Sequence, residues 1–210
     1  MTASLTFYTN PMSRGQIVRW MLEEVGAPYD QVLLDFSSGM KDAAFLAINP
    51  MGKVPAIKHG EHVVTECAAI CAYLADAFPE AGLAPAPSER ADYYRWLFFA
   101  AGPLEQALVN TSLGFEVPAE KTGMAGYGNF ALTVDVLELA VSKYDYVAGP
   151  KFSAADVYVG SQIVWGTRFG TLPKRPAFEA YAARVTARPA YIRANEIDGA
   201  LIAQAQQNKA

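Results

Sequence analysis

Hydrophobic and polar positions change their spacing part of the way along this chain. Up to about residue 78, short runs that alternate between apolar and polar residues are interspersed with stretches whose apolar residues recur every three or four positions. Beyond the late eighties only the longer spacing remains. A period of two is typical of half-buried strands, and the longer period is typical of amphipathic helices. The pattern predicts an α/β region followed by an all-α region.

The first region predicts strands and helices in turn. Residues 4–8 alternate and predict a strand, and the apolar positions between Ile17 and Val25 predict a helix that Gly26 ends. We further expect a strand over 29–36, a short helix over 41–48, a hairpin with strands at 54–58 and 62–64, and a helix over 66–77. This order favours an open sheet of the βαβ type over a helical bundle.

A proline-rich segment separates the two regions. Residues 78–88 contain three prolines and one glycine, so the preceding helix cannot continue through them. We therefore expect domains at 1–78 and 89–210, with a linker over 79–88. In the second domain we expect helices over 93–108, 130–144, 155–169 and 177–187, a last one near residue 192, and an irregular loop over 114–128.

Composition narrows the classes of partner. Acidic residues exceed basic ones by four, and no basic run occurs, which argues against a nucleic-acid groove or an anionic membrane surface. No apolar stretch approaches the roughly 20 residues that span a bilayer, and the start of the chain lacks signal-peptide features. We expect a cytoplasmic protein whose partner is a small molecule or another protein. Its two cysteines, Cys67 and Cys71, are expected to stay reduced.

Candidate binding chemistry lies in two motifs on either side of the predicted hairpin. Asn-Pro-Met-Gly-Lys-Val-Pro at 49–55 places Pro55 at a strand start, which suggests an edge or a cis bond. The backbone N–H and C=O of Val54 are then available to an extended peptide. In Thr-Glu-Cys-Ala-Ala-Ile at 65–70, Glu66 and Cys67 begin a helix, where free N–H groups favour a carboxylate. Alternatively, Pro55 only shapes a turn and Thr65 only caps the helix.

Taken together, the motifs resemble the cytosolic glutathione S-transferases of the bacterial type. The segment Tyr-Thr-Asn-Pro-Met-Ser-Arg-Gly at 8–15 is similar to the strand, turn and helix that carry the family's thiol-activating residue. Phe-Ser-Ala-Ala-Asp at 152–156 is similar to its helix-capping segment, with Ser153 as N-cap and Asp156 as its partner. The resemblance implies a thioredoxin-like N-terminal domain and an all-helical C-terminal domain. It also implies a homodimer, with glutathione as co-substrate and no metal or other cofactor.

The same resemblance assigns glutathione-holding residues. Val54, before Pro55, would hold the cysteinyl part through its backbone, and Lys53 would meet the glycine carboxylate. Glu66 and Cys67 would hold the γ-glutamyl end. The family usually has serine where this chain has Cys67, so a hydroxyl donor is replaced by a weaker thiol, and we expect looser binding.

Two residues are candidates for activating the glutathione thiol. The thiolate is the nucleophile, and each unit by which its pKa falls requires about 1.4 kcal/mol of preference for that form. Tyr8 ends the first predicted strand, and Ser13 opens the following helix. Tyr8 could instead be a core aromatic residue and Ser13 a helix cap, so a third possibility is that neither acts. No cysteine occupies this turn, which counts against the thiol-transfer branches of the family.

The implied reaction is attack of the glutathione thiolate on an apolar electrophile or a peroxide, as in detoxification. A non-catalytic ligand-binding or dimerising module of the same fold is an alternative, as is a glutathione-dependent isomerase, lyase or dehalogenase. We expect the apolar substrate to lie against the first long helix of the second domain. Some of the aromatic residues there could line an apolar pocket, but at helical spacing they more often belong to the core, and we assign none of them to the substrate: Tyr93, Trp96, Phe98 and Phe99.

Overall fold

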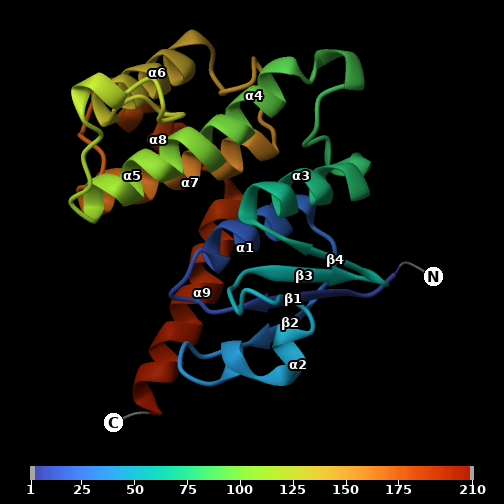
Figure 1. The fold of residues 1–210 in the computed structure, drawn as a ribbon. Coiled ribbons are helices and arrows are strands. Elements are labelled where there is room, and N and C mark those ends of the chain that lie inside the picture. The colour runs from blue at the N-terminus through green and yellow to red at the C-terminus, as the bar shows by residue number, and fades with distance from the viewer. Residues whose placement is uncertain (1–2, 209–210) are drawn as a thin grey trace. The chain divides into compact units, whose positions relative to one another are not determined.

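Four strands form one mixed sheet in the order β2-β1-β3-β4 (Figure 1). The computed structural model of the chain describes residues 3–208. The strands are β1 (Leu5–Thr9), β2 (Asp30–Leu33), β3 (Ala56–His59) and β4 (His62–Thr65). β1 runs parallel to β2 and antiparallel to β3, and β3 and β4 form the expected hairpin. The thioredoxin-like sheet that the sequence predicts is confirmed.

The side chains of β1 alternate between the two faces of the sheet. Leu5, Phe7 and Thr9 are buried, whereas Thr6 and Tyr8 are half-buried. Tyr8 is paired in register with Ala56 of β3. The end of β1 therefore lies next to the start of β3, which follows directly on the 49–55 motif.

Helices cover the sheet within the same compact unit, which consists of residues 3–82 and 187–208. α1 contains the apolar positions predicted from Ile17 to Val25 and is ended by Gly26, whose φ of 71° is in the left-handed region that glycine tolerates. The helical elements of this unit are α1 (Gly15–Val25), η1 (Gly39–Lys41), α2 (Ala43–Leu46), α3 (Cys67–Ala77), η2 (Pro79–Ala81) and α9 (Pro189–Gln207).

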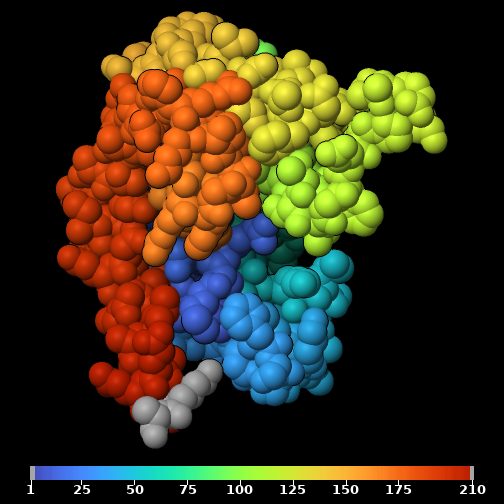
Figure 2. Space-filling model, turned by 90° about the vertical axis from the view of Figure 1, so that its left-hand side faces the viewer, coloured from blue at the N-terminus to red at the C-terminus, as the bar shows by residue number. Residues whose placement is uncertain are grey.

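The last helix, α9, packs against α1 (Figures 1 and 2), a grouping that the sequence pattern did not indicate. At the centre of this contact the buried Arg19 Nε lies 2.8 Å from Asp198 Oδ1. Nearer one end, Arg188 donates two hydrogen bonds to the carboxylate of Glu24, at 2.6 and 2.7 Å. Charge pairs and packing thus join two helices that are far apart in the sequence.

The second unit, residues 83–186, consists of helices and connecting loops, and its only β-structure is one isolated bridge between Tyr146 and Gly149. Its first long helix contains a π-helical segment with Pro103 inside, so the single helix expected over 93–108 is two helices around that segment. The helical elements are η3 (Pro87–Glu89), α4 (Ala91–Phe99), η4 (Ala100–Leu104), α5 (Glu105–Ser112), η5 (Ala119–Lys121), α6 (Phe130–Lys143), α7 (Ala154–Phe169) and α8 (Pro176–Thr186).

Helix α7 starts with the cap that the sequence predicts. The buried carboxylate of Asp156 accepts hydrogen bonds from the backbone N–H and the hydroxyl of Ser153, at 2.9 and 3.0 Å. It also accepts from the hydroxyl of Tyr181 at 2.7 Å and from the N–H of Val147 at 2.8 Å. Burial nevertheless raises the pKa of Asp156, and these hydrogen bonds offset part of that rise. The cap therefore also ties α8 and the preceding loop to α7.

Segment boundaries otherwise agree with the pattern to within a few residues. The segment over 114–128 is irregular as expected, apart from the short η5, and it projects from the surface of its unit (Figure 2). Among residues 3–208, no helix combines the length and the apolar character that a membrane span requires.

Candidate functional site

The turn between β1 and α1 is held by the side chain of Asn10. Its Nδ2 donates to the carbonyl of Leu34 at 2.8 Å, and its Oδ1 accepts from the N–H of Met12 at 2.9 Å. Asn10 is buried, so these two hydrogen bonds fix the path of the chain into α1. Ser13, a predicted candidate, lies within this turn.

The hydroxyl of Ser13 is half-buried at the N-terminus of α1. It donates to the carbonyl of Asn10 at 2.7 Å and accepts from the N–H of Gly15 at 2.9 Å. Its hydroxyl thus accepts from the first residue of α1, although the N-cap position itself is Arg14 and not Ser13. The same position is electrostatically suited to an anion, because the helix presents its positive dipole end there.

Tyr8, the other candidate activator, lies on the opposite face of the sheet from Phe7. Its ring centroid is 5.7 Å from that of Phe45 in α2, and it packs with Val54 against a small core formed by Met40, Phe45 and Ala56. Its hydroxyl has no hydrogen-bond partner among residues 3–208. The ring is thus anchored, and the hydroxyl is available.

Val54 presents an open backbone. The Val54–Pro55 peptide bond is cis, one of the two possibilities that the sequence suggested. Within residues 3–208 neither the N–H nor the C=O of Val54 makes a hydrogen bond. The segment before it is fixed by the buried Asn49, whose Nδ2 donates to the carbonyl of Lys53 at 2.8 Å. Val54 therefore offers one donor and one acceptor to an extended ligand.

Glu66 has the only positive φ of a non-glycine residue in the described part of the chain, at 66°. Such a conformation is uncommon for a residue with a side chain and is concentrated at functional sites. Glu66 is exposed and lies immediately before α3, and Cys67 is the first residue of that helix. The Cys67 thiol donates to the carbonyl of Arg14 at 3.7 Å. The N-termini of α1 and α3 therefore adjoin each other.

Lys41 was missed by the sequence analysis. It lies at the end of η1, and its ammonium donates to the carbonyl of Gly52 at 3.2 Å, next to the predicted Lys53. In the sequence it reads as a polar residue at the start of a short helix, eleven positions before Gly52. Only the folded loop shows that the Lys41 ammonium lies at Gly52, two residues before Val54.

A carboxylate organises the turn that precedes Lys41. Asp35 accepts hydrogen bonds from the N–H groups of Ser37, Ser38 and Gly39 and from both serine hydroxyls. These donors, the Ser38 N–H foremost, hold the pKa of Asp35 well below its ordinary value of 3.8. The turn therefore keeps an ionised side chain at its centre under mildly acidic conditions.

The aromatic residues of the second unit divide between core and surface. Tyr93 and Trp96 are buried, whereas Phe98 is 73% exposed and Phe169 is 70% exposed. The core interpretation is correct for the first two. The assignment of a second-substrate pocket to this helix stays a prediction.

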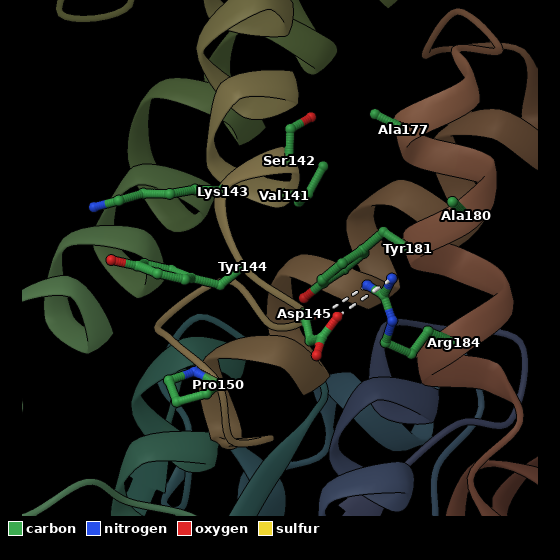
Figure 3. Close-up of a pocket in the computed structure, with 10 residues that line it drawn as sticks. All are labelled: Val141, Ser142, Lys143, Tyr144, Asp145, Pro150, Ala177, Ala180, Tyr181 and Arg184. Carbon is green, nitrogen blue, oxygen red and sulfur yellow. Dashed lines mark hydrogen bonds and ion pairs between the residues drawn. The ribbon is translucent and has the colours of Figure 1, made fainter.

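A separate hollow of about 600 Å³ lies between α6 and α8 (Figure 3). Arg184 crosses it and donates to the backbone carbonyl of Asp145 at 2.7 Å, with the Asp145 carboxylate 3.8 Å away. Tyr181 forms part of its lining, and none of the predicted glutathione-holding residues does. The predicted site residues instead all belong to the first unit.

Comparison with known proteins places these observations in a family. A model of the glutathione S-transferase N-terminal domain matches residues 3–76. Glutathione S-transferase 3 of Zea mays is 31% identical over 205 residues, covering 90% of this chain and 92% of the relative. Glutathione S-transferase GstB of Escherichia coli K12 is 29% identical, with 80% and 86% covered.

Solved structures give the same result over nearly the whole chain. A glutathione transferase from Methylococcus capsulatus matches with a TM-score of 0.76 and 28% identity, covering 93% of this chain and 98% of that one. A sphingomonad glutathione S-transferase in complex with glutathione matches with a TM-score of 0.74 and 30% identity, covering 92% and 98%.

Proposed function

Because the chain belongs to the glutathione S-transferase family and is a glutathione transferase, we propose that its first unit holds glutathione between the open backbone of Val54 and the adjoining starts of α1 and α3. The contact between the Cys67 thiol and the Arg14 carbonyl carries this proposal, because it brings two helix N-termini together. Two positive dipole ends favour both a carboxylate and a thiolate.

Each polar part of glutathione then has a partner in the first unit. The N–H and C=O of Val54 pair with the cysteinyl residue of glutathione. Glu66 and the N–H of Cys67 hold the γ-glutamyl end, where the carboxylate of Glu66 faces the amino group and the helix N-terminus faces the α-carboxylate. Lys53 and Lys41 attract the glycine carboxylate.

Ser13 is the proposed donor to the glutathione sulfur. Its oxygen is fixed by the Gly15 N–H, and the dipole of α1 adds to the stabilisation of a negative charge in front of it. The thiol proton leaves to solvent. The thiolate then uses its electron pair to form a C–S bond with an apolar electrophile, whose leaving group departs with the electrons of the broken bond. With a peroxide, the thiolate forms an S–O bond as the O–O bond breaks, and the departing alkoxide takes up a proton to become the alcohol. A second glutathione thiolate then attacks the sulfur of the resulting sulfenic acid, which gives glutathione disulfide and, with a proton, water.

Tyr8 is the second candidate for this role, supported by its unpartnered hydroxyl. Its ring is anchored on Phe45 beside Val54, so its donor also lies near the ligand's cysteinyl residue. We favour Ser13 because only its hydroxyl combines a fixed oxygen with a helix N-terminus.

The two candidates are separated by conjugation kinetics with 1-chloro-2,4-dinitrobenzene and glutathione. We expect Ser13→Ala to lower kcat/KM about 10- to 100-fold, the effect of removing a hydrogen bond to a charged group. In the same variant, Ser13→Ala, the apparent pKa of the bound thiol is expected to rise. Tyr8→Phe is the matched variant and is expected to retain most activity. The opposite ranking of the two variants would show that Tyr8 is the donor.

We further propose a homodimer in the cytoplasm that acts in detoxification of small apolar electrophiles. Exposed apolar side chains such as Met51, at 69%, and Phe98, at 73%, support self-association. Neither Cys67 nor Cys71 forms a disulfide within residues 3–208, in keeping with a reducing compartment. Light scattering during gel filtration is expected to give about twice the chain mass of 22.7 kDa. A mass of one chain at micromolar concentration would contradict the dimer.

A further inference from the structure

The hollow between α6 and α8 has the size of a small-molecule site. Its volume of about 600 Å³ falls in the range of roughly 300–1,000 Å³ that is typical of ligand pockets. One wall is a face of α8, where Ala177, Ala180 and Arg184 follow one another at helical spacing. The other wall is the last turn of α6 with the segment up to Asp145 (Figure 3). Because alanine side chains are short, the space between the two helices stays open.

Two opposite charges meet at one end of this hollow. Arg184 Nη1 donates to the backbone carbonyl of Asp145 at 2.7 Å, whereas the carboxylate of Asp145 is 3.8 Å from Nη2, beyond hydrogen-bond distance. Within residues 3–208 this carboxylate accepts no hydrogen bond, and Nε and Nη2 of Arg184 donate none. The two side chains are 37% and 74% exposed, so their ion pair contributes little to stability. Both charges therefore remain available to a ligand.

The end of α6 adds partial negative charge beside Asp145. α6 ends at Lys143, and the last carbonyl groups of a helix have no partner within it. Residues 141–145 line the hollow, so this helix end borders it. The ammonium of Lys143 lies over the ring of Tyr144 at 4.8 Å and points away from Arg184 (Figure 3). A cationic group of a ligand is therefore favoured beside Asp145 and an anionic group beside Arg184.

The remaining lining is mainly apolar. Ala177 and Ala180 contribute methyl groups from α8, and Pro150 contributes its ring from the loop before α7. Tyr181 is buried, and its hydroxyl is fixed by a hydrogen bond of 2.7 Å to the cap of α7. Ser142 supplies one hydroxyl to the same lining. These walls suit a short apolar chain next to the pair of charges.

We propose that this hollow binds an α-amino acid with a short apolar side chain. The α-carboxylate accepts hydrogen bonds from the free N–H groups of Arg184, and the α-ammonium donates to the Asp145 carboxylate and the last carbonyls of α6. The side chain lies along Ala177 and Ala180. A ligand with a single charge satisfies only one of the two charged groups. No residue is shared with the proposed glutathione site, so the two proposals stand or fall separately.

Nuclear magnetic resonance titration of the isotope-labelled full chain with L-leucine tests this site. Amide resonances of residues 141–145 and 177–184 are expected to shift and to saturate with a Kd in the millimolar range, because both charges are exposed. Isocaproate lacks the ammonium, and isoamylamine lacks the carboxylate. Each is expected to bind about tenfold more weakly, which is the effect of losing hydrogen bonds to one charged group. Equal binding of L-leucine and either analogue would overturn the proposal.

Asp145→Asn removes one charge and keeps the backbone carbonyl to which Arg184 donates. We expect this variant to melt like the parent and to bind L-leucine no better than isocaproate. Glu179→Gln is the matched control for net charge, because Glu179 is an exposed residue of α8 outside the lining. It is expected to keep the parental preference for L-leucine. The same preference in Asp145→Asn would show that its carboxylate does not hold the ammonium.

Ala180→Leu fills the hollow and leaves both charges in place. Ala180 is exposed and leucine favours helices, so we expect the fold to be retained and L-leucine binding to be lost. Ala183→Leu, exposed on α8 outside the lining, is the control and is expected to bind like the parent. Persistent binding to Ala180→Leu would place the amino acid outside the hollow.

Glutathione has the same head group at its γ-glutamyl end, followed by a polar chain. We expect it to shift the resonances of residues 141–145 and 177–184 far less than L-leucine does at equal concentration, because its amide groups meet apolar walls. Stronger shifts with glutathione than with L-leucine would show that the site takes a γ-glutamyl peptide and would overturn the assignment of a free apolar amino acid.

Discussion

Cys67 is the position at which this chain departs from the serine that its family usually has. The thiol is a weak donor and lies 3.7 Å from the Arg14 carbonyl. Cys67→Ser puts a hydroxyl at the start of α3, so we expect glutathione to bind more tightly, by up to about tenfold in Kd for one neutral hydrogen bond. Isothermal titration calorimetry measures this directly.

Cys71 provides the matched control for that substitution. It lies one helical turn further along α3 with no exposure, and burial raises the pKa of its thiol. Cys71→Ser is expected to lower stability, because the new hydroxyl is buried, and to leave the affinity for glutathione unchanged. Equal gains in affinity for the two variants would mean that the Cys67 position does not contact the ligand.

Lys41 is the residue whose proposed role only the fold suggests. Its ammonium is held at the Gly52 carbonyl, so Lys41→Ala is expected to raise the KM for glutathione about threefold to tenfold through loss of a charge-assisted contact, with little change in kcat. The effect is expected to shrink at high salt. Lys151→Ala, an exposed lysine in the second unit, controls for net charge. If the difference in KM between Lys41→Ala and the parent does not depend on salt, Lys41 does not contact the glycine carboxylate.

Among the elements of the first unit, the turn that begins at Asp35 has a predictable response to pH. Its hydrogen bonds lower the pKa in the folded state below the ordinary value of 3.8, so the ionised form stabilises the fold. This contribution is complete above the ordinary pKa and is lost as the pH falls through the lower folded-state value. The stability difference between the parent and Asp35→Asn, from urea denaturation, is expected to be constant above about pH 5 and to shrink below pH 4.

Elements with local signals were predictable, and those that depend on distant contacts were not. Gly26 ends α1 and Ser153 with Asp156 starts α7, as expected, because a left-handed cap and a capping box involve neighbouring residues only. The π-helical segment around Pro103 was missed, because an apolar period does not reveal which hydrogen bonds a proline interrupts. Ser13 and Cys67 were both found by motif, but the contact of the Cys67 thiol with the carbonyl of Arg14, the residue after Ser13, required the fold.

At the scale of the whole molecule, the first unit includes a helix from the far end of the chain. Asp198 on α9 faces the buried Arg19 of α1, which also donates to Tyr29 and Gln31. Asp198→Leu leaves this guanidinium buried without its counter-charge, and we expect a loss of about 3 to 5 kcal/mol in the free energy of unfolding.

A double variant checks that the cause is the unpaired charge. Arg19→Met with Asp198→Leu replaces both charges by apolar side chains and is expected to recover most of the lost stability in denaturant titrations. Additive losses from the two substitutions would show instead that packing and the remaining hydrogen bonds of Arg19 carry the energy.

The position of α9 at the end of the sequence also affects how the chain folds during its synthesis. A ribosome delivers the sheet and α1 first, then the whole of 83–186, and only afterwards the helix that covers Arg19. Domains usually fold as units during synthesis, in the order in which they emerge. Here the earlier unit is completed last, so a nascent chain must keep Arg19 hydrated until residues 187–208 have left the exit tunnel.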